Sequence, residues 1–156
     1  MNVVGTQHTG FSVVDLDRSI EFYRLLGCEV IWRREVTEKY FRDIVGVPDA
    51  VVQAAHLRVP GSSHIIELFE YAPQLAPSEL VPNVPGHAHL CFLVDDLPAM
   101  YEELQSEGLR FLSAPVRITA GVNEGGYGVY LLDPSGSTLE LFQPPASTAA
   151  TERRAG

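Results

Sequence analysis

The sequence contains only two cysteines, one lysine and no long apolar run. Cys28 and Cys91 are too few for a disulfide framework, and nothing in their spacing indicates a zinc site. No apolar run approaches the roughly 20 residues that cross a bilayer. The N-terminus lacks both the charged and the apolar region of a signal peptide, so we expect a cytoplasmic protein that is not bound to a membrane.

Basic residues as a class are also scarce. Eleven Lys and Arg stand against twenty Asp and Glu, which gives a net charge of −9. An extended basic surface for nucleic acid is therefore not expected, although a few local arginines could still hold a small anion. With 46% hydrophobic and 20% charged residues among 156, the composition indicates one ordinary globular domain.

The most informative pattern is an internal repeat. Residues 8–30 align with residues 89–111 at a constant offset of 81 and without a gap. The seven identical pairs are His8/His89, Phe11/Phe92, Val13/Val94, Asp15/Asp96, Leu16/Leu97, Glu21/Glu102 and Gly27/Gly108. Further on, Glu67-Leu68-Phe69 matches Glu140-Leu141-Phe142 at an offset of 73, so the first half carries eight extra residues. The chain is predicted to be a duplicated module.

Each module is predicted to have the order βαβββ, an α+β fold in which one helix covers one face of a mainly antiparallel, cupped sheet. In the first module, periodicity and the Asp15 N-cap predict a helix to about residue 26 and strands starting at His8 and at about 28–37, 51–59 and 65–71. In the second module, the same periodicity predicts a helix at about 97–107 and strands at about 87–94, 109–113, 126–132 and 138–143.

The domain boundaries follow from the repeat and from composition. Residues 38–49 are predicted to be an irregular connection that holds most of the extra length. We expect one domain over 1–145, with module one at about 5–72, a Pro-rich linker at about 73–85 and module two at about 86–145. The tail over 146–156 is predicted to be disordered.

Two histidines and two glutamates occupy equivalent positions of the two modules: His8 and His89 in the opening strands, Glu67 and Glu140 in the closing ones. Side chains alternate between the faces of a strand, so each of the four lies opposite the apolar residues that pack on the helix. One histidine at a strand start is usually structural. The repetition of the same pair on the same face favours a shared functional site.

Two imidazoles and two carboxylates make a donor set of intermediate hardness, suited to Zn, Ni, Co, Mn or Fe. Four protein ligands in an octahedral shell would leave two adjacent positions for a substrate with two oxygen atoms. The sequence therefore predicts a divalent metal ion held by His8, Glu67, His89 and Glu140.

The same residues carry a family resemblance. The segments HTGFSVVDLDRSIEFY from His8, IELFEY ending at Tyr71, GHAHLCFLVDDL ending at Leu97 and LLDPSGSTLELFQ ending at Gln143 resemble the vicinal oxygen chelate superfamily. That superfamily includes glyoxalase I, methylmalonyl-CoA epimerase, extradiol dioxygenases, fosfomycin-modifying enzymes and bleomycin-binding proteins. The resemblance covers roughly residues 5–145 and is specific to the superfamily rather than to one activity.

The resemblance implies the same four metal ligands. His87, two residues before His89, is the rival ligand, but the repeat places His89 in register with His8. It also implies that one of the ligating glutamates, Glu67 or Glu140, is the catalytic base. The residues that could supply a second acid or base are Glu35, Glu38, His56 and Glu124, and spacing does not choose among them.

The residues expected to contact substrate are His87, His56, Tyr127 and Arg58. Tyr127 lies in a Gly-rich stretch that resembles a ligand-closing loop of the family, and Arg58 belongs to a group of basic residues in the first half. These basic residues could form a rim for an acyl-CoA ester or could be solvated charges.

The activity that the resemblance implies is proton abstraction next to a carbonyl with a metal-stabilised enediolate. We expect an epimerase or isomerase of a small carbonyl compound, an acyl-CoA or a sugar-like ketone such as 2-epi-5-epi-valiolone, working as a homodimer. The alternatives are a glyoxalase I-like lyase and a non-catalytic antibiotic-binding protein. An extradiol dioxygenase is less expected, because those enzymes use two His and one Glu and are about twice as long.

Overall fold

The computed structural model describes residues 2–76 and 81–146. The chain divides into two compact units at residue 79. Each unit contains one mixed sheet and a helix packed against it, which confirms the predicted α+β class and the duplicated order. Among the described residues, no helix is long and apolar enough to cross a membrane.

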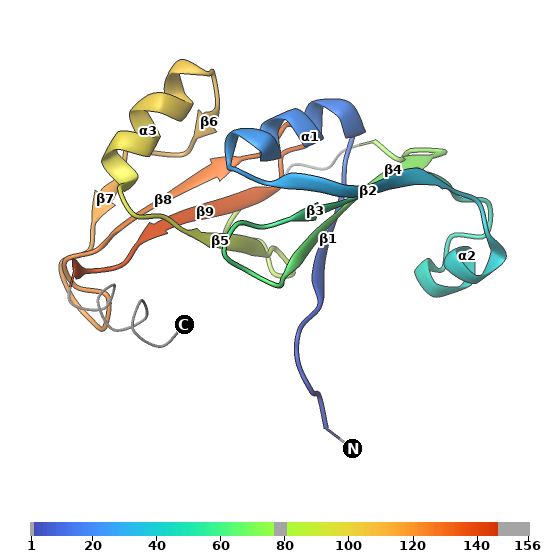
Figure 1. The fold of residues 1–156 in the computed structure, drawn as a ribbon, viewed down its shortest axis with the longest axis horizontal. Coiled ribbons are helices and arrows are strands. Elements are labelled where there is room, and N and C mark those ends of the chain that lie inside the picture. Colours follow the sequence, from blue (N-terminus) through green and yellow to red (C-terminus); the bar gives the residue numbers. More distant parts are fainter. Residues whose placement is uncertain (1, 77–80, 147–156) are drawn as a thin grey trace. The chain divides into compact units, whose positions relative to one another are not determined.

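Unit 1 contains β1 (His8–Ser12), α1 (Leu16–Leu25), β2 (Glu29–Val36), α2 (Lys39–Val45), β3 (Val51–Arg58) and β4 (Ile65–Ala72). Its sheet has the order β1-β4-β3-β2 (Figure 1). β1 runs parallel to β4, and the other neighbours are antiparallel. The opening and closing strands of the module are therefore hydrogen-bonded to each other.

Unit 2 repeats this arrangement with β5 (His89–Leu93), α3 (Leu97–Ser106), β6 (Arg110–Phe111), β7 (Val116–Arg117), β8 (Tyr127–Leu132) and β9 (Thr138–Gln143). The sheet order is β5-β9-β8-β6, with β7 paired to β8, and β5 is parallel to β9. The repeat seen in the sequence is thus a repeat of topology.

The helix starts are built identically in the two units. Asp15 accepts a hydrogen bond from the Arg18 N–H (3.0 Å), and Asp96 accepts one from the Ala99 N–H (3.1 Å). A second acceptor comes from the closing strand: Glu70 Oε2 receives the Leu16 N–H and Gln143 Oε1 receives the Leu97 N–H. The first turn of each helix is therefore fixed by its own N-cap and by a side chain of the closing strand.

One face of each sheet forms the core. In unit 1, the helix buries Leu16, Ile20 and Tyr23 against strands whose buried residues include Ile66 and Leu68. In unit 2, Leu97 and Leu104 are buried together with Leu131, Leu139 and Leu141. Since neighbours along a strand point to opposite faces, Glu67 and Glu140 lie on the faces opposite to those that α1 and α3 cover.

The structure corrects the prediction for residues 38–49. They are not wholly irregular, because residues 39–45 form α2, which lies on the other side of the unit 1 sheet from α1 (Figure 1). Lys39 and Asp43 pair across one turn at 2.6 Å. Gly46 ends the helix with a φ of 70°, which an L-residue rarely adopts.

The other boundaries differ less from expectation. The first strand of unit 2 begins at His89 rather than at residue 87, so His87 precedes it. The short strand β7 was not predicted. Of the predicted tail over 146–156, only residue 146 lies within the described residues, and part of the predicted linker, residues 77–80, also lies outside them. The single domain over 1–145 stays a prediction.

Replacing Asp96 with Ala should lower the free energy of unfolding by about 1 kcal/mol, because the Ala99 N–H loses its acceptor. Urea denaturation followed by circular dichroism measures the change. Asp95→Ala is the matched control, since this neighbouring carboxylate is exposed and does not cap the helix. An equal loss in both variants would contradict the assigned cap.

Candidate metal centre

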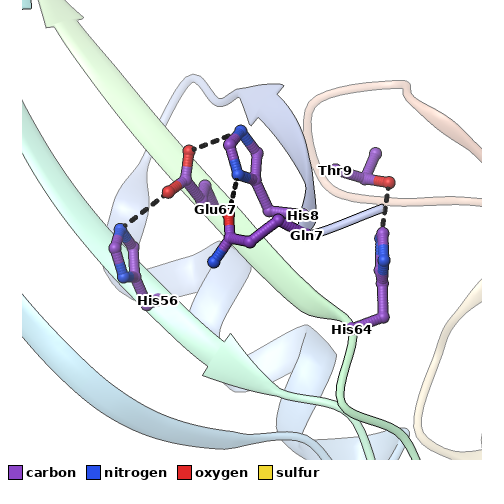
Figure 2. Close-up of polar contacts among 6 residues, drawn as sticks. All are labelled: Gln7, His8, Thr9, His56, His64 and Glu67. Carbon is purple, nitrogen blue, oxygen red and sulfur yellow. Dashed lines mark hydrogen bonds and ion pairs between the residues drawn. The ribbon is translucent and has the colours of Figure 1, made fainter. Parts of the chain in front are cut away.

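In unit 1, the carboxylate of Glu67 lies between two imidazoles (Figure 2). Its Oε2 is 3.2 Å from His8 Nε2, and its Oε1 is 2.9 Å from His56 Nε2. The Glu67 side chain is 13% exposed, against 44% for His8 and 29% for His56. A largely desolvated carboxylate thus has a nitrogen partner at each oxygen.

The strand register explains this cluster. Glu67 on β4 is directly opposite Gly10 on β1 and His56 on β3. Directly opposite residues share a face, so the His56 ring stands beside the carboxylate. His8 is two residues before Gly10 and therefore shares that face. Gly10 adds no side chain between His8 and the carboxylate.

Further contacts orient both imidazoles. The Nδ1 of His8 lies at the amide oxygen Oε1 of Gln7. This contact holds the His8 ring with its Nε2 directed at the Glu67 carboxylate. The His56 ring stacks on Trp32, with 4.5 Å between ring centroids. Neither imidazole is free to rotate without losing a neighbour.

Unit 2 places the equivalent pair together. His89 Nε2 is 3.1 Å from Glu140 Oε2. On the neighbouring strands, the residues opposite Glu140 are Cys91 and Tyr130. The Tyr130 hydroxyl lies 3.5 Å from His89 Nε2, and the two rings are in contact. Both units therefore bring a histidine and a glutamate into contact, but with different neighbours.

The Glu140 carboxylate also affects the two groups beside it. Burial raises the pKa of the Cys91 thiol to about 12, and the negative charge of Glu140 adds to the shift. Burial and the same carboxylate raise the pKa of Tyr130. Both groups are therefore protonated at neutral pH and offer hydrogen-bond donors rather than anions.

The distances within the two pairs suit metal ligation. Two donors that are about 2.1 Å from one metal ion and at right angles are about 3.0 Å apart. The two His–Glu separations of 3.2 and 3.1 Å are close to that value. Among the described residues, however, no group of three or more His, Cys, Asp and Glu has an arrangement that could hold a metal by itself. Each unit thus contains one histidine–glutamate pair at a spacing that suits ligation.

An apolar cluster borders the Glu67 site. Val36, Val52 and Ala54 are buried on the Glu67 face, and the partly buried side chains packed against them are Trp32, Phe41, Phe69 and Tyr71. Phe41 belongs to α2, and its ring meets that of Phe69 edge to face at 5.5 Å. The extra length of the first module therefore adds one ring, that of Phe41, to the aromatic side chains on the same face as the carboxylate.

Of the residues predicted to contact substrate, Arg58, Tyr127 and His87 do not contact any of the four predicted ligands in the described part of the chain. Arg58 is two residues from His56, but its guanidinium pairs with Glu29 at 3.3 Å. Tyr127 is on the face of β8 opposite to Tyr130 and Glu140. His87 precedes β5, and both its ring nitrogens are buried without a partner among the described residues. The structure brings only His56 to a predicted ligand.

The remaining acid/base candidates have partners of their own or lie apart. Glu35 accepts a hydrogen bond from Gln53, and Glu38 pairs with Arg34. Glu124 is exposed in the turn before β8. Gln7 and Tyr130 were not singled out from the sequence. The turn at residues 60–63 sets a hairpin register that pairs His56 with Glu67. The turn at residues 133–136 pairs Tyr130 with Glu140 in the same way, so these turns were the signal available in the sequence.

Comparison with known proteins agrees with this architecture. Residues 5–141 match the Glyoxalase/Bleomycin resistance protein/Dioxygenase superfamily, and the chain belongs to that family. This is the superfamily that the sequence motifs resembled.

Individual relatives include two kinds of enzyme. The chain is 33% identical to a 2-epi-5-epi-valiolone epimerase of Actinomyces sp., over 92% of this chain and 81% of the relative. It is 25% identical to a lactoylglutathione lyase of Arabidopsis thaliana, over 87% of this chain but 43% of the relative. Among solved structures, a glyoxalase family protein from Bacillus cereus matches with a TM-score of 0.81 at 19% identity, over 94% of this chain and 97% of the other.

Replacing Phe41 with Ala should detach α2 from the sheet, because its half-buried ring provides much of the contact. A loss of about 2 kcal/mol corresponds to a roughly thirty-fold increase in local opening. Hydrogen exchange of the α2 amides measures it, and exchange in β3 and β4 should stay unchanged. Ile44→Ala is the control, since Ile44 is 77% exposed. Equal exchange in both variants would contradict the assigned packing.

Proposed function

We propose that the chain is a divalent-metal-dependent epimerase or isomerase of a small ketone, with His8, Glu67, His89 and Glu140 as metal ligands. The observation that carries the proposal is the duplicated contact between a histidine Nε2 and a glutamate oxygen at 3.2 and 3.1 Å. Each unit contributes one nitrogen and one oxygen donor, a set suited to Zn, Ni, Co, Mn or Fe. The 33% identical epimerase supports the reaction class.

A bound metal ion would supply positive charge that stabilises the oxyanion formed when a carbon next to a carbonyl loses its proton. The chain must supply the base that takes this proton. Glu140 suits that role better than Glu67, because only one of its oxygens contacts an imidazole and its side chain is 25% exposed. Glu67, at 13% exposed and with both oxygens contacted, suits a fixed ligand. The donors of Tyr130 and Cys91 beside Glu140 would help to return the carboxylate to one orientation.

The charges of unit 1 favour a substrate without phosphate groups. Of the five basic residues that could have formed a rim for an acyl-CoA ester, four are paired with a carboxylate, in the pairs Arg33–Asp17, Arg34–Glu38, Lys39–Asp43 and Arg58–Glu29. The fifth, Arg42, has no ion pair among the described residues. A paired guanidinium or ammonium has less attraction left for an anion. A sugar-like ketone that chelates through two oxygens agrees better with the net charge of −9.

A lactoylglutathione lyase-like activity is the second candidate. The lyases of Arabidopsis thaliana and Brassica oleracea that resemble the chain support it, but the chain spans only 43% of their length. In both candidate activities, the base abstracts a proton next to a carbonyl. They differ in the carbon to which the proton returns. A binding protein without catalysis would need neither His–Glu pair.

Solvent deuterium incorporation tests the proposal. Protein loaded with metal should exchange one carbon-bound hydrogen of 2-epi-5-epi-valiolone, followed by NMR, without oxygen uptake. Glu140→Gln should lower the exchange rate by about 10² to 10⁴, the usual contribution of a general base, and weaken metal binding. Glu103→Gln, an exposed carboxylate of α3, is the matched control.

Three outcomes would count against this proposal. A protein that is purified without chelator, contains less than about a tenth of an equivalent of metal and rebinds none would not be a metalloenzyme. Unchanged exchange in the Glu140 variant would show that this residue is not the base. Turnover of the hemithioacetal of glutathione, without exchange in the ketone, would favour the lyase. The homodimer and the cytoplasmic location also stay predictions, and sedimentation tests the first.

A further inference from the structure

The two glutamates of the proposed ligand set have different residues opposite them on the neighbouring antiparallel strand. Opposite Glu67, the neighbouring antiparallel strand presents His56, whereas opposite Glu140 it presents Tyr130. His56 Nε2 contacts Glu67 Oε1 at 2.9 Å, while the Tyr130 hydroxyl is aimed at the histidine of its unit, 3.5 Å from His89 Nε2. Only the first unit therefore places an imidazole donor on its glutamate from the side away from the ligand histidine.

His56 itself is firmly held. Its ring stacks on Trp32 at 4.5 Å, and the guanidinium of Arg34 lies over the Trp32 ring at 5.4 Å from the centroid. Trp32 on β2 lies directly opposite His56 on β3, and Arg34 is two residues further along β2 on the same face. Arg34 in turn pairs with Glu38 at the start of α2. The orientation of His56 thus depends on a packed stack rather than on solvent.

We propose that His56 is a positioning residue that fixes the Glu67 carboxylate through Oε1, so that Oε2 remains aimed beside His8 Nε2 as a ligand. Without the contact, the carboxylate could rotate about its terminal torsion, which is broad for Glu. The metal ion would then have to order this carboxylate on binding. Loss of such a partner to a ligand typically costs 10- to 100-fold in metal affinity. This inference rests on the proposed function, because it assumes that Glu67 ligates a metal.

The chain offers a matched comparison within the same unit. His64 is also a partly buried imidazole, but its Nε2 meets the hydroxyl of Thr9 at 2.8 Å and contacts no carboxylate (Figure 2). His56→Phe removes the donor to Glu67 and keeps an aromatic ring for Trp32. His64→Phe makes the same chemical change away from the carboxylate.

The measurement is the dissociation constant of Co²⁺, by calorimetry on the full chain, together with the visible absorption of the bound ion. We expect His56→Phe to weaken Co²⁺ binding by about 10-fold or more and to change the absorption spectrum. His64→Phe should do neither. His56→Gln, whose amide can still donate to Oε1, should recover the affinity to within about three-fold of the wild type.

A double-mutant cycle separates positioning from a general loss of structure. In a Glu67→Gln background, His56→Phe should have little further effect on Co²⁺ binding, because the oxygen that it positions is no longer a carboxylate. If His56→Phe does not fold by circular dichroism, His56→Asn serves in its place, since the shorter amide cannot span the contact. Equal losses in the two backgrounds would overturn the proposal.

The outcomes distinguish this inference from the proposed function. Wild-type protein that binds no Co²⁺ would overturn both. Wild-type protein that binds Co²⁺ while His56→Phe binds as tightly as His64→Phe would overturn the positioning role alone. Failure of His56→Gln to recover the affinity would also overturn it, because a hydrogen-bond donor would then not be what matters.

Discussion

The alternation of side chains along four short strands is the constraint on which the rest of this molecule depends. In each unit, the closing strand directs leucine or isoleucine to the helix and a single glutamate to the other face. The apolar residues stabilise the unit by burial, and the same period of two directs the carboxylate to the face opposite α1 or α3. A shift of one residue in the register would bury both glutamates in the core and leave the leucines on the site face.

The duplication also couples the site to the helix ends. Three residues beyond Glu67 and Glu140, the same strands provide Glu70 and Gln143, which accept the first N–H groups of α1 and α3. These acceptors point to the helix-covered face, as the parity requires. The strand that carries the proposed ligand is thus also hydrogen-bonded to the helix that packs on its other face.

Much of this arrangement was predictable because it depends on local rules. Alternation predicted the faces of His8, Glu67, His89 and Glu140, and the paired Asp15 and Asp96 predicted the helix starts. α2 was not predicted because seven residues are too few to show a helical periodicity. The helix also depends on the packing of Phe41 on Phe69, a contact between residues distant in sequence. The face of β8 on which Tyr127 lies depends on the register of β8 with β9, which the Gly-rich approach to the strand does not specify.

The stack beside Glu67 has a practical consequence. Trp32 is the only tryptophan in the chain, and its ring lies against the imidazole that contacts the carboxylate. Indole emission is sensitive to neighbouring charge and to ring stacking. The protein therefore carries an intrinsic fluorescent reporter within one side chain of its candidate centre. Metal binding at the proposed Glu67 site should therefore change the Trp32 emission, which needs no label and no replaced residue.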